Sequence, residues 1–239
     1  MRKYNILFIK LEYYGLSIIH KMNIPSRIFA IIILIVLLPF LFIVCIISFF
    51  SQGLPIIFFQ KRVGYKNKQF MIYKFRTMVD NQCINDFSNF NDHRVTKWGR
   101  FLRYYKIDEL PQLINIIFGD MVFIGPRPEL NFYVSKYNEY FDYLDKIKPG
   151  ITDLSSVLFR DEDKIVKEHF GKAGYSEILK IKSELTNHYL KKRKFINDFK
   201  LIFFTIITIF LPEFGIKKLV LPTFLKPFPE KARIFQDIY

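Results

Sequence analysis

The sequence predicts a mostly helical α+β protein that is bound to a membrane from one side. Residues 28–50 carry no charged side chain and are long enough to reach across a hydrocarbon core of about 30 Å. The more polar remainder combines two short strand-like segments with several helical patterns, and no linker in it separates a second soluble domain. A chain of 239 residues is expected to bury one sizeable core. We therefore expect a leader and membrane helix over residues 1–59 and one compact cytoplasmic domain over residues 60–239, with interfacial C-terminal helices.

The apolar stretch favours a re-entrant hairpin, which dips into the membrane and returns. Cations flank it on both sides, at Arg2, Lys3, Lys10, Lys21 and Arg27 before it and at Lys61, Arg62, Lys66 and Lys68 after it. Because such cations favour the cytoplasmic side, both ends of the stretch are expected there. Pro39 removes one backbone hydrogen bond near the middle and would break the helix. An ordinary spanning helix with a tolerated proline is the alternative. A cleaved signal peptide is disfavoured by the length of the stretch and by its polar leader.

Residues 54–78 predict a β-hairpin. Apolar and aromatic residues alternate with cations on both sides of a turn at residues 64–68. The two strands carry Arg62, Lys74 and Arg76. Residues 80–92 are rich in Asn and Asp and show no period, so a loop is expected there.

Two helices are predicted next, over residues 97–105 and 108–118. One face of the second is apolar and consists of Leu110, Leu113, Ile114 and Ile117. Asp108 can cap this helix, Pro111 is tolerable in its first turn, and Gly119 ends it.

The C-terminal third predicts further helices. Residues 161–199 are charged and mostly helical in pattern. Residues 201–211 are apolar but too few to span a membrane, which favours a buried or interfacial helix. The tail after them interleaves Lys with Leu, Val and Phe, as in surfaces that lie among anionic lipid headgroups. Ordinary core packing of these apolar residues is the alternative.

Composition limits the possible partners. Lys and Arg outnumber Asp and Glu by 36 to 22, a formal net charge of +14, so anionic partners are expected. The apolar stretch favours anionic membrane lipids and phosphorylated metabolites over nucleic acid, which is not an expected partner. Cys45 and Cys83 are the only cysteines. Two cysteines are too few for a disulfide framework or a four-thiolate metal site, so we expect most of the chain to face a reducing cytosol. No pair with the sequence spacing of metal ligands occurs among the four histidines, which are His20, His93, His169 and His188.

Asp108 and Glu109 lie beside an excess of cations. Four precede them, at Arg94, Arg100, Arg103 and Lys106, and a fifth, Arg127, follows between two prolines. Arginine binds phosphate bidentately, and two carboxylates next to bound phosphates can hold Mg²⁺. A carboxylate can also be a covalent nucleophile toward phosphorus. A simpler role for two acids in a first helical turn is to cap amide groups and to meet the positive end of the helix dipole.

A resemblance to a known family rests on several blocks in order, "QKRVGYKNKQFMIYKFRTM", "DHRVTKWGRFLRYYKIDELPQLINIIFGDMVFIGPRPEL", "KPGIT" and "HYLKKRKFINDFKLIFFTI". They resemble the bacterial sugar transferase family of monotopic polyprenyl-phosphate phosphoglycosyl transferases, from the membrane segment to about residue 211. Three departures stand out. Residues 153–156 replace a common Gly-Leu-Trp-Gln type of sequence, Leu38-Pro39 replaces a Ser-Pro pair, and Asn67 replaces a frequent glycine.

The resemblance implies an enzyme on the cytoplasmic face of the bacterial inner membrane. Such an enzyme moves a sugar 1-phosphate from a UDP-sugar to a polyprenyl phosphate, such as undecaprenyl phosphate, and releases UMP. This is the first membrane step in making an exopolysaccharide, capsule, O-antigen or glycoprotein glycan. Anionic membrane lipids and downstream glycosyltransferases are the other partners that we expect.

The resemblance also implies roles for individual residues. Asp108 would be the nucleophile that carries a covalent phospho-sugar, and Glu109 would bind Mg²⁺ together with Asp108. Arg103 would contact a substrate phosphate, and Pro126, Arg127 and Pro128 would contact the nucleotide. We assign Arg62, Lys74 and Arg76 of the hairpin to substrate binding, and the helix break to Pro39.

A membrane-tethered scaffold or binding protein of the same pathway is the alternative function. In such a protein Asp108 and Glu109 would only cap a helix. The joint presence of both acids with Arg103 and Arg127 favours the enzyme, because a scaffold has no need to keep all four.

Overall fold

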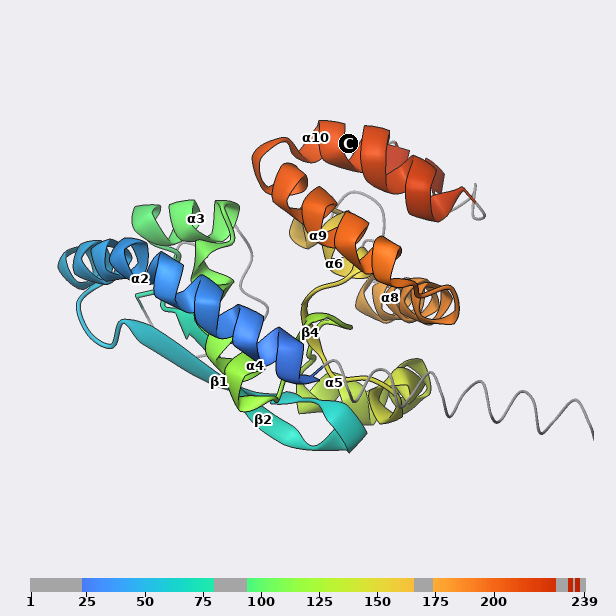
Figure 1. Cartoon of the computed structure of the whole chain (residues 1–239), viewed down its shortest axis with the longest axis horizontal. Coiled ribbons are helices and arrows are strands. Elements are labelled where there is room, and N and C mark those ends of the chain that lie inside the picture. Colours follow the sequence, from blue (N-terminus) through green and yellow to red (C-terminus); the bar gives the residue numbers. More distant parts are fainter. Residues whose placement is uncertain (1–22, 80–93, 166–173, 227–231, 234, 237–239) are drawn as a thin grey trace, which may run out of the picture.

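The computed structural model describes residues 23–79, 94–165, 174–226, 232–233 and 235–236 (Figure 1). The expected loop at residues 80–92 lies outside these residues. So do several residues used above, namely Arg2, Lys3, Lys10, Lys21, Cys83, His20, His93 and His169.

The fold is mostly helical, as predicted, and contains two small sheets, of which the sequence predicts only the hairpin. The helices are α2 (Asn23–Gln52), α3 (Lys97–Tyr104), α4 (Leu113–Phe118), α5 (Asn131–Lys136), α6 (Leu154–Leu158), α7 (Glu162–Ile165), α8 (Gly174–Lys191), α9 (Phe195–Phe210), α10 (Pro212–Phe214) and the π-helical η7 (Gly215–Leu225). The strands are β1 (Ile57–Val63), β2 (Gln69–Phe75), β3 (Val122–Ile124) and β4 (Gly150–Thr152). The 3₁₀ turns are η1 (Tyr65–Asn67), η2 (Ile107–Gln112), η3 (Asn138–Tyr140) and η4 (Asp142–Asp145).

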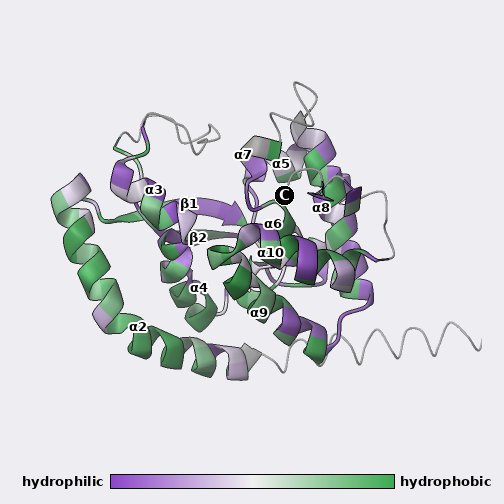
Figure 2. Cartoon of the chain, turned by 90° about the horizontal axis from the view of Figure 1, so that it is seen from above, coloured by the Kyte–Doolittle hydropathy of each residue, from purple (hydrophilic) through white to green (hydrophobic). Residues whose placement is uncertain are grey.

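The apolar stretch forms helix α2, which contains Pro39. Figure 2 shows the helix as a mostly apolar ribbon along one side of the protein, changing direction part-way along its length. A proline inside a helix is a known cause of such a bend. Among the described residues, this is the one helix long and apolar enough to cross a membrane, and only 11% of its most apolar window is buried.

Both halves of α2 are attached to the rest of the protein. Ala30 packs in one cluster with Ile116 of α4, and Leu41 packs in another with Leu102 of α3. The Arg27 guanidinium donates to the Phe118 carbonyl at 3.2 Å, where α4 ends. At the far end of α2, the Gln52 side chain donates to the Arg76 carbonyl at 3.0 Å.

Strands β1 and β2 form the predicted hairpin. They pair antiparallel from Ile57 opposite Phe75 to Val63 opposite Gln69, and η1 makes the turn between them. Asn67 has a positive φ of 56°, a conformation that Asn tolerates better than most residues. The turn therefore accepts Asn67 where a glycine is frequent.

The predicted single helix over residues 108–118 is instead the 3₁₀ turn η2 followed by α4. Pro111 has no N–H to donate to a helical bond and disfavours α geometry at the residue before it, which explains the tighter turn. The expectation that Asp108 caps this helix is wrong, because Lys106 and Gln112 occupy the two cap positions and neither turn has a side-chain cap. Gly119 ends α4 with a φ of 87°, as predicted.

Strands β3 and β4 pair in parallel and join two segments that are distant in sequence. The Gly125 N–H donates to the Thr152 carbonyl at 3.1 Å, and the Gly150 N–H donates to the Pro126 carbonyl at 3.0 Å. A Cβ on either glycine would collide with the other segment. This close approach fixes the backbone that carries Arg127.

The C-terminal helices surround a separate core. Figure 1 shows α8, α9 and α10 gathered beyond β4, on the side away from α2. Leu201 and Phe204 of α9 are buried in this core, whereas Phe203, Ile206 and Phe210 on its other face are exposed. Helix α9 is thus both half-buried and apolar on its outer side. In the tail, Ile216, Val220, Leu221 and Phe224 are buried, so core packing is correct for these residues.

Candidate active site

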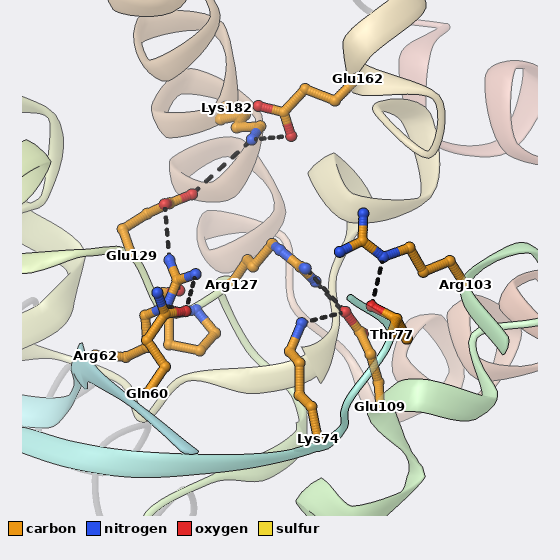
Figure 3. Close-up of polar contacts among 11 residues, drawn as sticks. Gln60, Arg62, Lys74, Thr77, Arg103, Glu109, Arg127, Glu129, Glu162 and Lys182 are labelled. Carbon is orange, nitrogen blue, oxygen red and sulfur yellow. Dashed lines mark hydrogen bonds and ion pairs between the residues drawn. The ribbon is translucent and has the colours of Figure 1, made fainter. Parts of the chain in front are cut away.

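Glu109 is the centre of a buried ion-pair cluster. Its carboxylate, on η2, is only 8% exposed. The Lys74 ammonium of β2 donates to Oε1 at 2.9 Å, and Arg127 donates to the same oxygen at 2.8 Å and to Oε2 at 3.4 Å. Figure 3 shows the two cations converging on this carboxylate from different elements. Burial alone would raise the pKa of Glu109, but Arg127 and Lys74 hold it well below its usual range.

Asp108 is equally buried but lacks such partners. Its Oδ1 makes no hydrogen bond within the part of the chain that the structure describes. Burial raises the pKa of the Asp108 carboxyl, and the Glu109 charge adds to this effect, while Lys74, Lys106 and Arg103 oppose it. A buried carboxylate oxygen without a donor is costly, so it is expected where another group binds during function.

Two further cations act on Asp108. The Arg103 Nε, on α3, donates to the Thr77 hydroxyl at 2.9 Å, which fixes the direction of its guanidinium. Lys106 precedes η2 with a left-handed backbone at φ 56°, and its carbonyl accepts the Glu109 N–H. Both side chains lower the pKa of Asp108, so their positive charges lie within electrostatic reach of its carboxylate.

The Pro126-Arg127-Pro128 segment is held against the hairpin. The Arg62 guanidinium of β1 donates to the Pro128 carbonyl at 3.5 Å, and the Val63 N–H donates to the Glu129 carbonyl at 2.9 Å. Arg62 also donates to the Gln60 side chain and lies 3.7 Å from the Glu129 carboxylate. In this structure Arg62 therefore supports the Arg127 segment.

The structure brings together most of the predicted site residues. Asp108, Glu109, Lys74, Arg103 and Arg127 share one buried region, and Arg62, Pro126 and Pro128 border it.

Arg76 and Pro39 do not join this region. The Arg76 guanidinium donates to the carbonyls of Gln52 and Gly53, at the end of α2. Arg76 thus contacts the membrane helix, and Pro39 lies within that helix.

Comparison with known proteins decides the family. A model of bacterial sugar transferases matches residues 21–212, which include the dyad, the hairpin and the Arg127 segment. The chain belongs to the bacterial sugar transferase family. The resemblance seen in the sequence blocks is thereby confirmed.

Bacterial sugar transferases of several organisms are similar to this chain. It is 37% identical over 166 residues to the UDP-N-acetylgalactosamine-undecaprenyl-phosphate N-acetylgalactosaminephosphotransferase of Aeromonas hydrophila, with 67% of this chain and 36% of that protein covered. It is 34% identical over 161 residues to the sugar transferase EpsL of Bacillus subtilis, with 67% and 73% covered. It is 31% identical over 182 residues to the UDP-glucose:undecaprenyl-phosphate glucose-1-phosphate transferase of Escherichia coli, with 74% and 37% covered. The chain thus spans little more than a third of the Aeromonas and Escherichia proteins. Together with helix α2, the family match identifies a membrane-associated protein.

In this bacterial sugar transferase, the carboxylate oxygens of Asp108 and Glu109 suit a hard divalent cation that also binds substrate phosphate. No group of three or more His, Cys, Asp or Glu side chains that could hold a metal occurs among the described residues. Mg²⁺, however, usually takes only one or two protein carboxylates and completes its shell with phosphate oxygens and water. Suitable oxygens are Oδ1 of Asp108, which has no hydrogen bond among the described residues, and the weakly bonded Oε2 of Glu109.

Sequence reasoning missed a second buried cluster beside Arg127. It contains Glu129, Glu162 and Lys182, which come from the segment before α5, from α7 and from α8. The only signal in the sequence was the charge of Glu129 directly after Pro128. The pairing of Lys182 with residues 20 and more positions away has no local pattern that could reveal it.

Proposed function

We propose that this protein transfers a sugar 1-phosphate from a UDP-sugar to undecaprenyl phosphate, with release of UMP, through a covalent intermediate on Asp108. One observation carries the proposal. Of two adjacent buried carboxylates, Glu109 is bonded to two cations, while Oδ1 of Asp108 has no donor among the described residues. A carboxylate with a free oxygen beside several cations suits a nucleophile that attacks an anionic phosphate.

In the first step, an Asp108 carboxylate oxygen forms a bond to the phosphorus that carries the sugar. The bond from that phosphorus to the oxygen bridging toward uridine breaks, and this oxygen leaves on UMP. The negative charge of the donor diphosphate is met by Arg103 and Lys106, whose positive charges act on the Asp108 carboxyl. Phosphoryl transfer depends mainly on such charge neutralisation and on in-line positioning.

In the second step, a phosphate oxygen of the polyprenyl carrier attacks the same phosphorus. The bond to Asp108 breaks, the carboxylate is regenerated, and the sugar remains on a polyprenyl diphosphate. Because UMP leaves before the lipid reacts, a soluble donor and a membrane-bound acceptor use one site in turn. Ping-pong kinetics follow from this order.

Asp108 and Glu109 would hold Mg²⁺, with Glu109 binding through its weakly bonded Oε2. When bound, the ion supplies positive charge to the phosphate oxygens of the donor. Arg127 and Lys74 keep Glu109 ionised and in place, so the second carboxylate is ready to bind a cation. We propose Mg²⁺ because it suits carboxylate and phosphate oxygens.

We also propose that α2 is re-entrant and that the active site faces the cytoplasm at the bacterial inner membrane. A straight helix of 30 residues would be about 45 Å long and would separate its ends across the bilayer. Here Arg27 near one end and Gln52 at the other are both hydrogen-bonded to the same domain. Ser48 also accepts a hydrogen bond from the Trp98 indole at 2.8 Å, which attaches the second half of α2 to α3. These contacts support a helix that returns to the side from which it entered.

Relatives that are named for transfer to undecaprenyl phosphate carry three different sugars in their names, namely N-acetylgalactosamine, galactose and glucose. The sugar of this chain is therefore a matter for experiment. We propose that its product feeds polysaccharide or glycan assembly, with anionic lipids around α2 and glycosyltransferases acting next.

The test is UMP release by purified protein. The protein in detergent is offered undecaprenyl phosphate, Mg²⁺ and each of UDP-glucose, UDP-galactose, UDP-N-acetylglucosamine and UDP-N-acetylgalactosamine. With at least one donor, we expect UMP release beyond one equivalent per protein to depend on the lipid acceptor. A non-catalytic scaffold would release none with any of the four.

A further inference from the structure

A buried, charge-balanced cluster adjoins the proposed phosphate site. Lys182 and Glu129 are 7% and 8% exposed. The Lys182 ammonium is 2.8 Å from Glu162 Oε2 and 3.9 Å from Glu129 Oε1, and Arg62 approaches the other Glu129 oxygen at 3.7 Å. Two cations thus face two carboxylates. This balance does not favour another phosphate.

One oxygen of the cluster lacks a partner. Glu162 Oε1 is buried and makes no hydrogen bond with any of the described residues, although Oε2 is bonded to Lys182. A buried carboxylate oxygen without a donor costs free energy unless a donor arrives. A hydrogen-bond donor at this oxygen would complete its bonding, and a neutral donor would also keep the charge balance of the cluster.

Two aromatic rings pack against the Lys182 side chain of the cluster. The Lys182 ammonium lies 5.7 Å from the centre of the Phe159 ring and 5.8 Å from that of the Tyr175 ring. The Tyr175 hydroxyl is 3.5 Å from Glu129 Oε2. Polar groups set among aromatic rings suit a ligand with both hydroxyl groups and apolar C–H faces.

Arg127 links this cluster to the dyad. Glu109 raises the pKa of Arg127 despite the opposing effect of burial, and Glu129 and Glu162 add to the rise. All three carboxylates therefore lie within electrostatic reach of one guanidinium. Figure 3 shows the Glu162–Lys182 pair on one side of Arg127 and the Glu109–Lys74 pair on the other.

We propose that Glu162 contacts the sugar of the donor, with its Oε1 accepting a hydrogen bond from a sugar hydroxyl group. Lys182 and Glu129 are positioning residues that hold the Glu162 carboxylate. This inference rests on the proposed function, because the sugar must lie beside the phosphate that Asp108 attacks. A site that requires one hydroxyl discriminates against donors that lack it or hold it elsewhere, because the buried oxygen is then left unpaired. Glu162 is thus a determinant of sugar specificity.

The substitution Glu162→Gln tests this role with little change in shape. Its single side-chain oxygen stays on the Lys182 ammonium, so an amide NH₂ replaces the free acceptor. The measured quantities are kcat/KM for the four UDP-sugars and inhibition by UDP, which lacks the sugar. The ratio of kcat/KM between two donors does not depend on how much of the protein is folded. Glu177→Gln on α8 is the matched control, since this carboxylate is exposed.

We expect Glu162→Gln to lower kcat/KM for the preferred donor by about 10- to 100-fold and to reduce its preference over the next donor by a similar factor. UDP inhibition should stay within about twofold of wild type. Lys182→Met should also reduce the preference, because Glu162 loses its anchor, whereas Glu177→Gln should change nothing.

Three outcomes overturn the inference. One is an unchanged donor preference in Glu162→Gln, and another is UDP inhibition that weakens in parallel with donor use, which marks a structural or nucleotide-binding role. The third is wild-type protein that releases no UMP from any donor, which removes the proposed function as well. Active wild type with an unchanged Glu162→Gln overturns the sugar contact alone.

Discussion

The Lys74 ammonium lies 2.9 Å from Oε1 of Glu109, although the two residues are 35 positions apart in sequence. Burial lowers the pKa of Lys74, and the Glu109 charge opposes this effect. The pair joins the hairpin strand β2 to the turn η2 that carries both carboxylates. We therefore place Lys74 in the candidate active site through its contact with Glu109.

Lys74→Met should lower kcat by about 100-fold. Without this ammonium, Arg127 is the one cation still hydrogen-bonded to Glu109 among the described residues, so the Glu109 charge repels Asp108 and the donor diphosphate more strongly. Lys74→Arg, which keeps the charge, should retain more activity. Lys68→Met in the exposed hairpin turn is the control. Equal kcat values for Lys74→Met and the control would show that the ion pair has no part in turnover.

Arg76→Ala should destabilise the attachment of α2. The buried guanidinium donates to two carbonyls at the end of this helix, and charge-assisted bonds contribute about 1.5–3 kcal/mol each. We expect a loss of about 3 kcal/mol, measured by chemical denaturation in detergent. Arg100→Ala, an exposed arginine of α3, should lose less than about 0.5 kcal/mol. Similar losses in both variants would contradict the role given to Arg76.

Local patterns in the sequence identify much of this fold. The apolar stretch predicts α2, the alternation around residues 64–68 predicts the hairpin, and Gly119 predicts the end of α4. Each of these features depends on neighbouring residues alone. The adjacency of Asp108 and Glu109 likewise marks the site.

Pairings between distant residues have no such pattern. No local sequence pattern distinguishes Lys74 from Arg76, two positions later. Lys74 contacts Glu109, whereas Arg76 contacts the end of α2. Successive strand residues point to opposite faces, so two residues that are two positions apart would point to the same face of a continuing strand. Strand β2 ends at Phe75, and only this end separates the roles of Lys74 and Arg76. An Asp at the start of an apolar helical pattern predicts a cap, but the 3₁₀ turn that contains Pro111 already begins at Ile107, before Asp108.

Labelling in intact cells tests the topology of α2. In a background with Cys45 and Cys83 replaced by Ser, Lys3→Cys should resist a membrane-impermeant thiol reagent, because the N-terminus and the active site are expected to share the cytoplasmic side. Labelling after cell lysis is the control for reactivity. Ready labelling in intact cells would mean that α2 spans the membrane.

Pro39→Leu should shift the same protein toward a spanning topology. Leucine restores the missing backbone donor and removes the ring clash, and the stretch is already long enough to span. We expect mixed or inverted labelling of the cysteine at position 3. Unchanged protection would indicate that the contacts of Arg27 and Gln52 set the turn without Pro39.

The two carboxylates should respond differently to loss of charge. Glu109→Gln should be strongly impaired through weaker metal binding, so raised Mg²⁺ should restore some turnover in this variant only. Asp108→Asn should not recover at any Mg²⁺ concentration, because an amide is a very poor nucleophile. UMP release across a Mg²⁺ titration measures both. Equal recovery of the two variants would remove the division of roles.

The most direct test of the covalent intermediate is intact-protein mass spectrometry after incubation with the donor alone. Wild type should gain the mass of one phospho-sugar and lose it when undecaprenyl phosphate is added. Asp108→Asn should show no adduct, and its rate of UMP release should be lower than that of wild type by about 10³-fold or more. If both residues only stabilised the fold, the substitution would cost about 1 kcal/mol or less and leave activity largely intact. A wild-type protein that turns over without ever carrying the added mass, or an Asp108→Asn variant with near-normal turnover, would contradict the mechanism.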